Sequence, residues 1–303
     1  ALADAVLRVT ARWCWDRLKN RHREEPAIAI IGYGKLGGKE LGYGSDLDIV
    51  FVFDDDDDNA SEIYSAFVRK LINWLTVKTG EGDLFEIDTA LRPNGNAGML
   101  VSSFRSYADY QQQRGSNTAW TWEHQAITRA RFCAGDESIG NQFEKARLDI
   151  LETQRDIKQL KIDVLDMREK MLEKHKVDHE LFDLKQDRGG IIDIEFIVQY
   201  FVLAFGSSNK ALTQNIGNIG LLNLFSEQNL MEALTAKKLI SAYRLYRELQ
   251  HQLGLETKLD GKIKYSEVVD HPAEVVSIWK SIFNTCNHYL WFLTREYLLF
   301  FFK

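Results

Sequence analysis

The chain has 303 residues, of which 45% are hydrophobic and 27% are charged, and its formal net charge is −6 at pH 7. A chain of this length and composition can bury a sizeable core, and we expect two domains. The negative charge argues against a dedicated nucleic-acid binder, which carries a basic surface, but it does not exclude ATP, whose site needs only local positive charge and a metal ion.

The first 80 residues predict alternating helices and strands. Apolar residues among charges indicate an amphipathic helix over 1–23, which Pro26 closes. A short apolar strand over 27–31 leads through a glycine-rich loop and a short helical turn to a β-branched strand over 46–53. A helix is expected over 61–79, where the apolar residues have helical spacing.

The next 60 residues predict a mixture of loops, strands and helices. Five consecutive aspartates, 54–58, indicate a solvated loop, because like charges repel and stay hydrated. Alternating apolar and polar residues predict a strand over 84–91 that ends at Pro93, and a further short strand around 99–102. The pattern over 104–131 is mostly helical.

The pattern changes after Gly135. A long charged helical stretch is expected over 141–176, a strand-like patch over 181–184, and helices from Ile191 to the end. We therefore predict an α+β fold followed by an all-α bundle, with one domain over 1–140 and the second over 141–303.

The cysteines and the chain ends bear on location. The three cysteines are isolated, without metal or disulfide spacing, which favours the cytoplasm. No signal peptide is recognised, and the apolar segment 289–302 is too short for a membrane span and is interrupted by Arg295 and Glu296, so we expect a buried terminal helix. Because the chain starts at Ala1 in mid-pattern, we expect it to be part of a longer protein.

The glycine loop has the spacing of a dinucleotide-binding fingerprint, with Gly32, Gly34 and Gly37 after a strand. That fold needs a crossover of a dozen or more residues before the next parallel strand, and only seven residues separate Gly38 from Asp46. The loop also lacks the Lys-Ser/Thr of a P-loop. The sequence therefore argues against a dinucleotide-binding site and against a P-loop.

Three aspartates form a candidate metal site. Asp46 and Asp48 stand two residues apart on a strand and so share one face. Asp88 is on the strand predicted over 84–91, and a neighbouring strand could bring it to the same place, although it could also be a surface residue on an edge strand. Three such carboxylates can hold two Mg²⁺ ions about 3.5–4 Å apart, which suits in-line nucleotidyl transfer.

The ordered motifs resemble a known family. Gly32-Tyr-Gly-Lys-Leu-Gly-Gly-Lys-Glu-Leu with Ser45-Asp-Leu-Asp resembles the DNA polymerase β-type nucleotidyltransferases and, among them, the glutamine-synthetase adenylyltransferase family. Glu86-Ile-Asp-Thr-Ala-Leu-Arg-Pro resembles the strand with the third carboxylate, and Ala119-Trp-Thr-Trp-Glu-His-Gln-Ala a helical motif. Phe182-Asp-Leu-Lys and Gly189-Gly-Ile-Ile-Asp-Ile-Glu-Phe resemble the motif of the family's helical domain.

The resemblance implies a polymerase β-like catalytic domain, a mixed sheet flanked by helices, that uses ATP and two Mg²⁺ ions. The family's enzyme has two such halves, one adding AMP from ATP to a tyrosine of glutamine synthetase with release of pyrophosphate, the other removing it by phosphorolysis. Gly-Tyr-Gly-Lys, Gly42-Tyr-Gly-Ser, Gly98-Met-Leu-Val and Trp120-Thr-Trp-Glu-His resemble the adding half. The alternatives are the removing half, a uridylyltransferase of a PII-type signalling protein, and a non-catalytic nucleotide-sensing module.

The resemblance also implies partners and roles for single residues. Glutamine synthetase would be the substrate, and the PII signalling protein and glutamine the regulators, with no nucleic acid or membrane partner. Asp46 and Asp48 would bridge both metal ions, and Asp88 would bind the catalytic one and help deprotonate the incoming tyrosine. The residues expected at the nucleotide are Gly37, Gly38 and Ser45 as donors, although Ala90 stands where the family has a first arginine. Lys35 and Arg92 would supply positive charge there, and a solvated lysine and a structural arginine are equally good explanations of these two residues.

Four further residues are weaker candidates. Glu123 lies beside Trp120 and Trp122, which core packing alone would also explain. Lys185, Asp193 and Glu195 could line a cleft between the domains, but a helix-capping turn at Gly189 and Gly190 would explain the same residues. His175 and His179 have a metal-compatible spacing, but their region is charged and lacks the glutamate of a His-Glu-x-x-His motif, so we expect no metal there.

Overall fold

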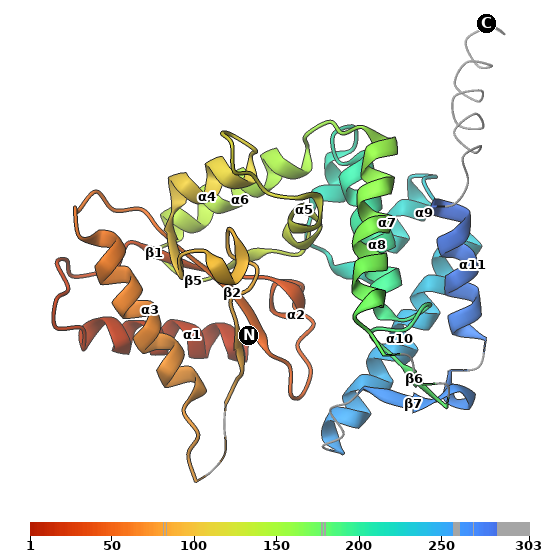
Figure 1. Cartoon of the computed structure of the whole chain (residues 1–303), viewed down its shortest axis with the longest axis horizontal. Helices are drawn as coiled ribbons and strands as arrows, with labels where there is room; N and C mark the ends of the chain where they lie inside the picture. The colour runs from red at the N-terminus through yellow and green to blue at the C-terminus, as the bar shows by residue number, and fades with distance from the viewer. Residues whose placement is uncertain are drawn as a thin grey trace, which may run out of the picture.

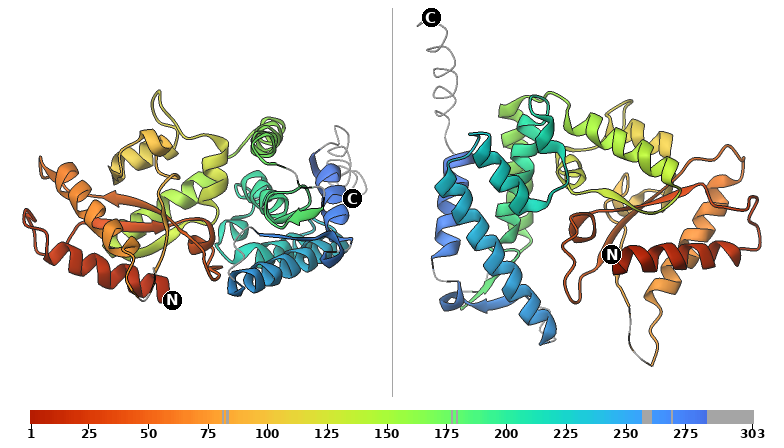
Figure 2. Two further views of the ribbon diagram at one scale, coloured as in Figure 1. Left: turned by 60° about the horizontal axis from the view of Figure 1, so that its bottom comes forward. Right: turned by 180° about the vertical axis from the view of Figure 1, so that it is seen from behind.

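The computed structural model describes residues 1–80, 82, 84–176, 178, 180–256, 261–268 and 270–283. A part that contains a β-sheet lies beside an array of helices, on the left and right of Figure 1 respectively, and the two other views show the same arrangement (Figure 2). The predicted fold class, a mixed sheet flanked by helices and followed by a helical part, is confirmed.

The main sheet is mixed and short. Its strands are β1 (Ile28–Gly32), β2 (Leu47–Phe53), β3 (Ile87–Asp88), β4 (Val101–Ser103) and β5 (Arg131–Gly135). The strand order is β3-β2-β1-β5, and β4 also pairs with β2. β1 is antiparallel to β2 and β5, whereas β3 and β4 run parallel to β2.

Helices cover both faces of this sheet. All five residues of β1 are buried, as expected for a strand with packing on each side. Helices α1 (Leu2–Asp16) and α3 (Ala60–Thr76) lie on one side, and α4 (Phe104–Gln111) and α6 (Glu137–Leu151) on the other (Figure 1). Two shorter helices, α2 (Gly34–Gly37) and α5 (Thr121–Ile127), lie toward the helical part (Figure 1).

The helical part is built around α8 (Ile191–Phe205), whose residues are apolar on almost every side and mostly buried. Around it lie α7 (Ile157–Glu173), α9 (Gly217–Glu227), α10 (Ala233–Leu255) and α11 (His271–Phe283). A two-stranded antiparallel sheet of β6 (Leu181–Asp183) and β7 (Lys262–Lys264) completes it, with 3₁₀ turns at Gly95–Ala97, Lys210–Thr213 and Tyr265–Glu267 in the chain.

Several elements differ from their predicted extent. The first helix ends at Asp16, α3 ends at Thr76, and the strand predicted over 84–91 is reduced to Ile87–Asp88. The helical stretch over 104–131 is two helices with a loop between them, and the following strand β5 was not predicted, nor was β7. The stretch over 141–176 breaks into α6 and α7, because the Asp156 side chain accepts hydrogen bonds from the N–H groups of Lys158 and Gln159 and caps the start of α7.

The run of five aspartates is not a uniformly solvated loop. The Asp55 side chain is mostly buried and accepts hydrogen bonds from Tyr64 Oη (2.7 Å) and Arg23 (3.0 Å). Burial raises the pKa of this carboxyl, but the hydrogen bonds more than offset that effect and hold the pKa well below its usual range. The prediction was therefore wrong for Asp55, which joins the strand end to α3.

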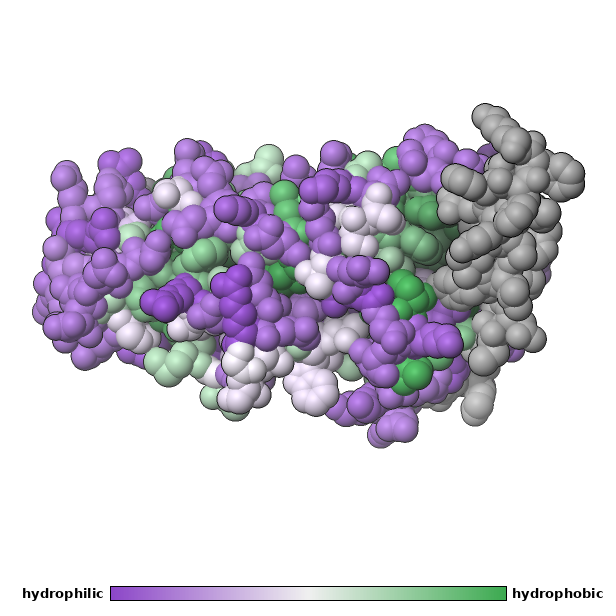
Figure 3. Space-filling model, turned by 90° about the horizontal axis from the view of Figure 1, so that it is seen from above, coloured by the Kyte–Doolittle hydropathy of each residue, from purple (hydrophilic) through white to green (hydrophobic). Residues whose placement is uncertain are grey.

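Three predictions about domains, membranes and the C-terminus have different outcomes. The domain boundary near residue 140 stays a prediction; α6 starts at Glu137 and packs against β1 and β5. Within the described residues, no helix is long and apolar enough to cross a membrane, and the face in Figure 3 is mostly hydrophilic with scattered apolar residues. The predicted terminal helix over 289–302 lies outside the described residues.

Candidate active site

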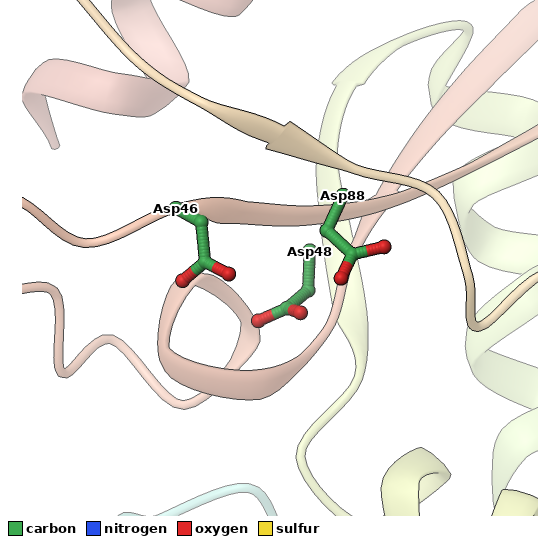
Figure 4. Close-up of side chains that lie close together, drawn as sticks. All are labelled: Asp46, Asp48 and Asp88. Atoms are coloured by element: carbon green, nitrogen blue, oxygen red, sulfur yellow. The ribbon is translucent and has the colours of Figure 1, made fainter.

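Three carboxylates converge at the edge of the sheet. The parallel pairing of β2 and β3 places Asp48 opposite Asp88, and Asp46 shares the face of Asp48 because it stands two residues earlier. Each of the three offers an oxygen, and these oxygens lie within 4.8 Å of one another. Figure 4 shows the side chains extending from the two strands to the same side. The structure thus brings together the three aspartates predicted to be neighbours, and we call them the acidic cluster.

The charges of the acidic cluster oppose one another. Burial, together with the charges of Asp46 and Asp88, raises the pKa of Asp48 to about 6, and nearby Lys185 and Lys35 offset only part of this shift. Oxygen-only donor sets of this kind suit Mg²⁺, and a divalent cation would remove the repulsion. The donor set therefore fits the metal that the sequence predicts.

The glycine loop packs directly against the acidic cluster. Gly34, at the start of α2, has φ +49°, and a Cβ placed there would lie 2.1 Å from Asp48 Oδ2. The N–H of Tyr33 donates to the Asp48 backbone carbonyl at 2.9 Å and fixes the loop to the strand. Gly34 is therefore required by its conformation and by the space that Asp48 occupies.

Gly37 and Gly38 pack against Arg129. A Cβ at Gly37 would lie 2.2 Å from the Arg129 carbonyl oxygen, and one at Gly38 would lie 2.5 Å from an Nη of its guanidinium. Their N–H groups donate to the carbonyls of Tyr33 and Gly34. The sequence predicted these two glycines as phosphate donors; that role stays a prediction, and the structure shows a packing reason for them as well.

Arg129 joins the glycine loop to the helical part. Its buried guanidinium donates to Glu40 at 2.7 Å and to Glu195 of α8 at 2.5 Å. Tyr243 of α10 donates to Glu40 at 2.5 Å, and Asn215 Nδ2 donates to the Gly37 and Arg129 carbonyls at 3.0 Å each. We call Glu40, Arg129, Glu195 and Tyr243 the Arg129 cluster.

The Arg129 cluster includes one predicted residue, Glu195, and three that sequence reasoning missed. Glu195 was predicted to line a cleft between the domains; that role stays a prediction, and the structure shows that the residue pairs with Arg129. Arg129, Glu40 and Tyr243 were not predicted, because single charged or aromatic residues in separate helices and loops carry no spacing signal.

Cations from both parts of the chain lie beside the acidic cluster. Burial lowers the pKa of Lys35, and so do the charges of Lys185 and Arg247, whereas Asp46 and Glu195 act in the opposite direction. Arg247 of α10 also donates to the Glu40 carbonyl and to Gln250 at 2.7 Å. Lys35, Lys185 and Arg247 form the basic cluster. Lys35 and Lys185 were predicted, whereas Arg247 was missed, since only the fold places α10 next to the glycine loop.

Ser45 and Arg92 are held by local hydrogen bonds. Ser45 Oγ accepts from the Gly42 N–H at 3.0 Å, within the turn before β2. Arg92 donates to the Thr89 carbonyl at 2.7 Å and to the Gly98 carbonyl at 3.3 Å, and so holds the loop that follows β3. Their predicted contacts with the nucleotide stay predictions.

The remaining candidates have structural partners. Asp193, in the first turn of α8, is buried and accepts from Arg168 of α7 and from the Gly189 N–H at 2.5 and 2.6 Å, and so neutralises Arg168. Its predicted place in a cleft stays a prediction. Glu123 is buried and accepts from Tyr110 Oη and the Trp120 N–H. Trp120 is 70% exposed, so the alternative explanation by core packing does not apply to this residue.

The histidine pair is only partly described. His175 Nε2 lies 2.8 Å from an Asp187 carboxylate oxygen, and His179 lies outside the described residues.

Comparisons with known proteins match two family models and a set of similar proteins to this chain. The model of the family described as "Glutamate-ammonia ligase adenylyltransferase" matches residues 1–146, and that described as "GlnD PII-uridylyltransferase" matches residues 158–260. The bifunctional glutamine synthetase adenylyltransferase/adenylyl-removing enzyme of Burkholderia mallei is 48% identical over 93% of this chain and 31% of that protein. The enzymes of the same name from Ralstonia nicotianae and Nitrosomonas europaea are each 47% identical over 94% of this chain. The matched region is 30% of the first protein and 32% of the second.

The carboxylates, the glycine loop and the helical part thus belong to a segment with a consistent set of relatives. The chain spans about a third of the length of those relatives. It therefore belongs to the family of the bifunctional glutamine synthetase adenylyltransferase/adenylyl-removing enzymes.

Proposed function

We propose that this chain transfers AMP from ATP to a tyrosine hydroxyl of glutamine synthetase, with Mg²⁺, and releases pyrophosphate. The observation that carries the proposal is the acidic cluster, whose three carboxylate oxygens lie within 4.8 Å of one another, with the cations Lys35 and Lys185 nearby. The names of the relatives support the acceptor, and the adding-half motifs around Gly32 and Trp120 support the direction.

Each cluster has a distinct task in this reaction. Asp46, Asp48 and Asp88 would hold the metal, which when bound neutralises charge on the phosphates and activates the attacking hydroxyl. Asp88, the most exposed of the three, would face the incoming tyrosine and accept its proton. Lys35, Lys185 and Arg247 would hold the triphosphate and orient pyrophosphate for departure.

The test uses the chain with glutamine synthetase, Mg²⁺ and ATP labelled on its α-phosphate. We expect label on glutamine synthetase and equimolar pyrophosphate, both lost in Asp48→Asn. If that variant labels at the wild-type rate, the proposed mechanism is wrong. Release of ADP from adenylylated glutamine synthetase on addition of phosphate, without labelling by ATP, would identify the removing half instead.

One observation favours a second candidate. The match of residues 158–260 to the uridylyltransferase family supports transfer of UMP to a PII-type protein. UTP and PII in the same assay distinguish the two, because a uridylyltransferase would label PII from UTP and leave glutamine synthetase unlabelled. The same match supports PII as a regulator. We also propose that glutamine is a regulator and that the protein is cytoplasmic.

A further inference from the structure

The three carboxylates of the acidic cluster are not held in the same way. Asp48 and Asp88 face each other in the paired strands β2 and β3, so the hydrogen bonds of the sheet hold their backbones in register. Asp46 precedes β2, which starts at Leu47. Its position therefore depends on the loop that leads into the strand, residues 39–45, which we call the entry loop.

A tight turn ends the entry loop directly before Asp46. Ser45 Oγ accepts from the Gly42 N–H at 3.0 Å, and the Ser45 N–H donates to the Gly42 carbonyl at 3.3 Å. Gly44, within the turn, has φ +67°, a conformation that favours glycine. Because these bonds tie Ser45 to Gly42, a displacement of Gly42 or Tyr43 also displaces Asp46, the residue after Ser45.

One face of α10 lies along the entry loop. Tyr243, Arg247, His251 and Gly254 are spaced four, four and three residues apart and so share this face. Tyr243 and Arg247 donate to the carboxylate and to the backbone carbonyl of Glu40, near the start of the loop. Hydrogen bonds to the helical part thus hold this end of the entry loop.

The other two residues of this face contact the turn. A Cβ at Gly42 would lie 3.2 Å from His251 Nε2, and the rings of His251 and Tyr43 meet at 80° with 6.4 Å between their centres. A Cβ at Gly254 would lie 3.0 Å from the Tyr43 carbonyl oxygen. α10 therefore packs closely against the turn before Asp46.

We propose that His251 and Gly254 are positioning residues for the metal site. Through the entry loop they hold Asp46 where it can share a Mg²⁺ ion with the other two carboxylates of the acidic cluster. Mg²⁺ demands near-ideal octahedral geometry, so a small displacement of one carboxylate lowers the affinity. The proposal rests on the proposed function, which places the metal at the acidic cluster. It adds that the helical part supports the metal site although it provides none of the three carboxylates.

Calorimetric titration of the intact chain with Mg²⁺, without ATP or glutamine synthetase, tests this role apart from AMP transfer. His251→Ala removes the imidazole from the turn, and we expect the Mg²⁺ affinity to fall about tenfold, as is typical when a group that orients a metal ligand is removed. The midpoint of urea unfolding should be unchanged, because the His251 side chain is only partly buried. Unchanged Mg²⁺ affinity, with or without a lower urea midpoint, would overturn the proposal.

His251→Gln is the conservative variant. Its side-chain amide reaches about as far as imidazole Nε2 and can keep the contact with Gly42, so the Mg²⁺ affinity should return to the wild-type value. An affinity as low as that of His251→Ala would show that this contact does not position the entry loop, and would contradict the proposal.

Gly254→Ala separates positioning from stability. Alanine is the better helix former, so the urea midpoint should be unchanged or higher. The added methyl group presses on the Tyr43 carbonyl, so the Mg²⁺ affinity should nevertheless fall. A higher midpoint with unchanged Mg²⁺ affinity would refute the role of Gly254.

Gln252→Ala is the matched control. Gln252 follows His251 in α10, and its side chain is exposed. This variant should change neither the Mg²⁺ affinity nor the urea midpoint. A loss of affinity equal to that of His251→Ala would indicate a general change in α10 and would overturn the assignment.

Failure of the proposed function gives a different result. Asp48→Asn should abolish Mg²⁺ binding, which places the titrated ion at the acidic cluster, and binding that survives this substitution would overturn the positioning role. A wild type that binds Mg²⁺ there but does not label glutamine synthetase would refute the proposed function. The difference in Mg²⁺ affinity between His251→Ala and the wild type would then still decide the positioning role.

Discussion

The acidic cluster and the Arg129 cluster pack against different glycines of the same short loop, and their charges interact in opposite ways. In the acidic cluster three like charges converge, and burial with that repulsion raises the pKa of Asp48 to about 6. In the Arg129 cluster one buried guanidinium lies between two carboxylates at 2.7 and 2.5 Å. Gly34 contacts the first cluster and Gly38 the second.

The repulsion within the acidic cluster opposes folding, whereas the ion pairs of the Arg129 cluster belong to the folded structure. Converging carboxylates destabilise the folded chain until a cation joins them, so their arrangement has a functional explanation. A paired buried arginine is strongly destabilising only when one partner is removed. Substitutions in the first cluster should therefore affect activity, and substitutions in the second should affect folding, metal position and activity together.

A substitution in the acidic cluster should have the largest effect on activity. Asp48→Asn should lower AMP transfer about a thousandfold, because stabilisation of transition-state charge by a bound metal contributes several kcal/mol. Without metal, the thermal unfolding midpoint should be unchanged or higher, since one of three repelling charges is lost. Transfer assays and thermal melts measure the two effects. Asp56→Asn, at an exposed position outside the cluster, is the control and should change neither. A destabilised but active Asp48→Asn variant would show that Asp48 supports folding rather than metal binding.

Arg129→Met should act on folding. It leaves Glu40 and Glu195 without their shared cation, so the free energy of unfolding should fall by about 3 kcal/mol. Urea denaturation measures this loss. Arg188→Met breaks a pair with Glu169 in which both side chains are about half exposed, and it should change stability by less than about 0.5 kcal/mol. Equal losses of unfolding free energy in the two variants would show that the Arg129 ion pairs matter no more for stability than an exposed pair.

Gly34→Ala tests how closely the loop and the acidic cluster are coupled. A methyl group at φ +49° and 2.1 Å from Asp48 Oδ2 must displace the carboxylate. We expect Mg²⁺ affinity and transfer to fall about tenfold, with about 1 kcal/mol of lost stability. Calorimetric titration with Mg²⁺ measures the affinity. Gly80→Ala, where a Cβ meets nothing within 4 Å, should leave it unchanged.

The smallest effect is a pH dependence. The raised pKa of Asp48 means that the carboxylate gains a proton as the pH falls through about 6, and a protonated carboxyl binds Mg²⁺ poorly. Mg²⁺ affinity should therefore fall several-fold between pH 7 and pH 5. Asp56→Asn should retain this dependence, whereas Asp48→Asn should flatten it. An affinity that is constant over this range in the wild type would show that Asp48 does not control metal binding.

Residues that are close in the sequence or that share a periodic pattern were predicted well. Asp46 and Asp48 lie on one face because side chains alternate along a strand, and the short gap after Gly38 excluded the dinucleotide fold. The apolar runs located β1 and β2 within a residue or two. Asp88 was predicted on a strand that alternating residues indicate over 84–91, and the structure keeps Ile87–Asp88 of that strand beside β2.

Local periodicity and spacing were thus enough to predict the sheet and the helices, the glycine loop and the three carboxylates. The folded chain was needed to see that Arg129, Glu40, Glu195 and Tyr243 meet, that Arg247 lies beside Lys35, and that Asp193 neutralises Arg168. These contacts join residues far apart in the chain. Their geometry is set by how the helices pack, which no local pattern of side chains encodes.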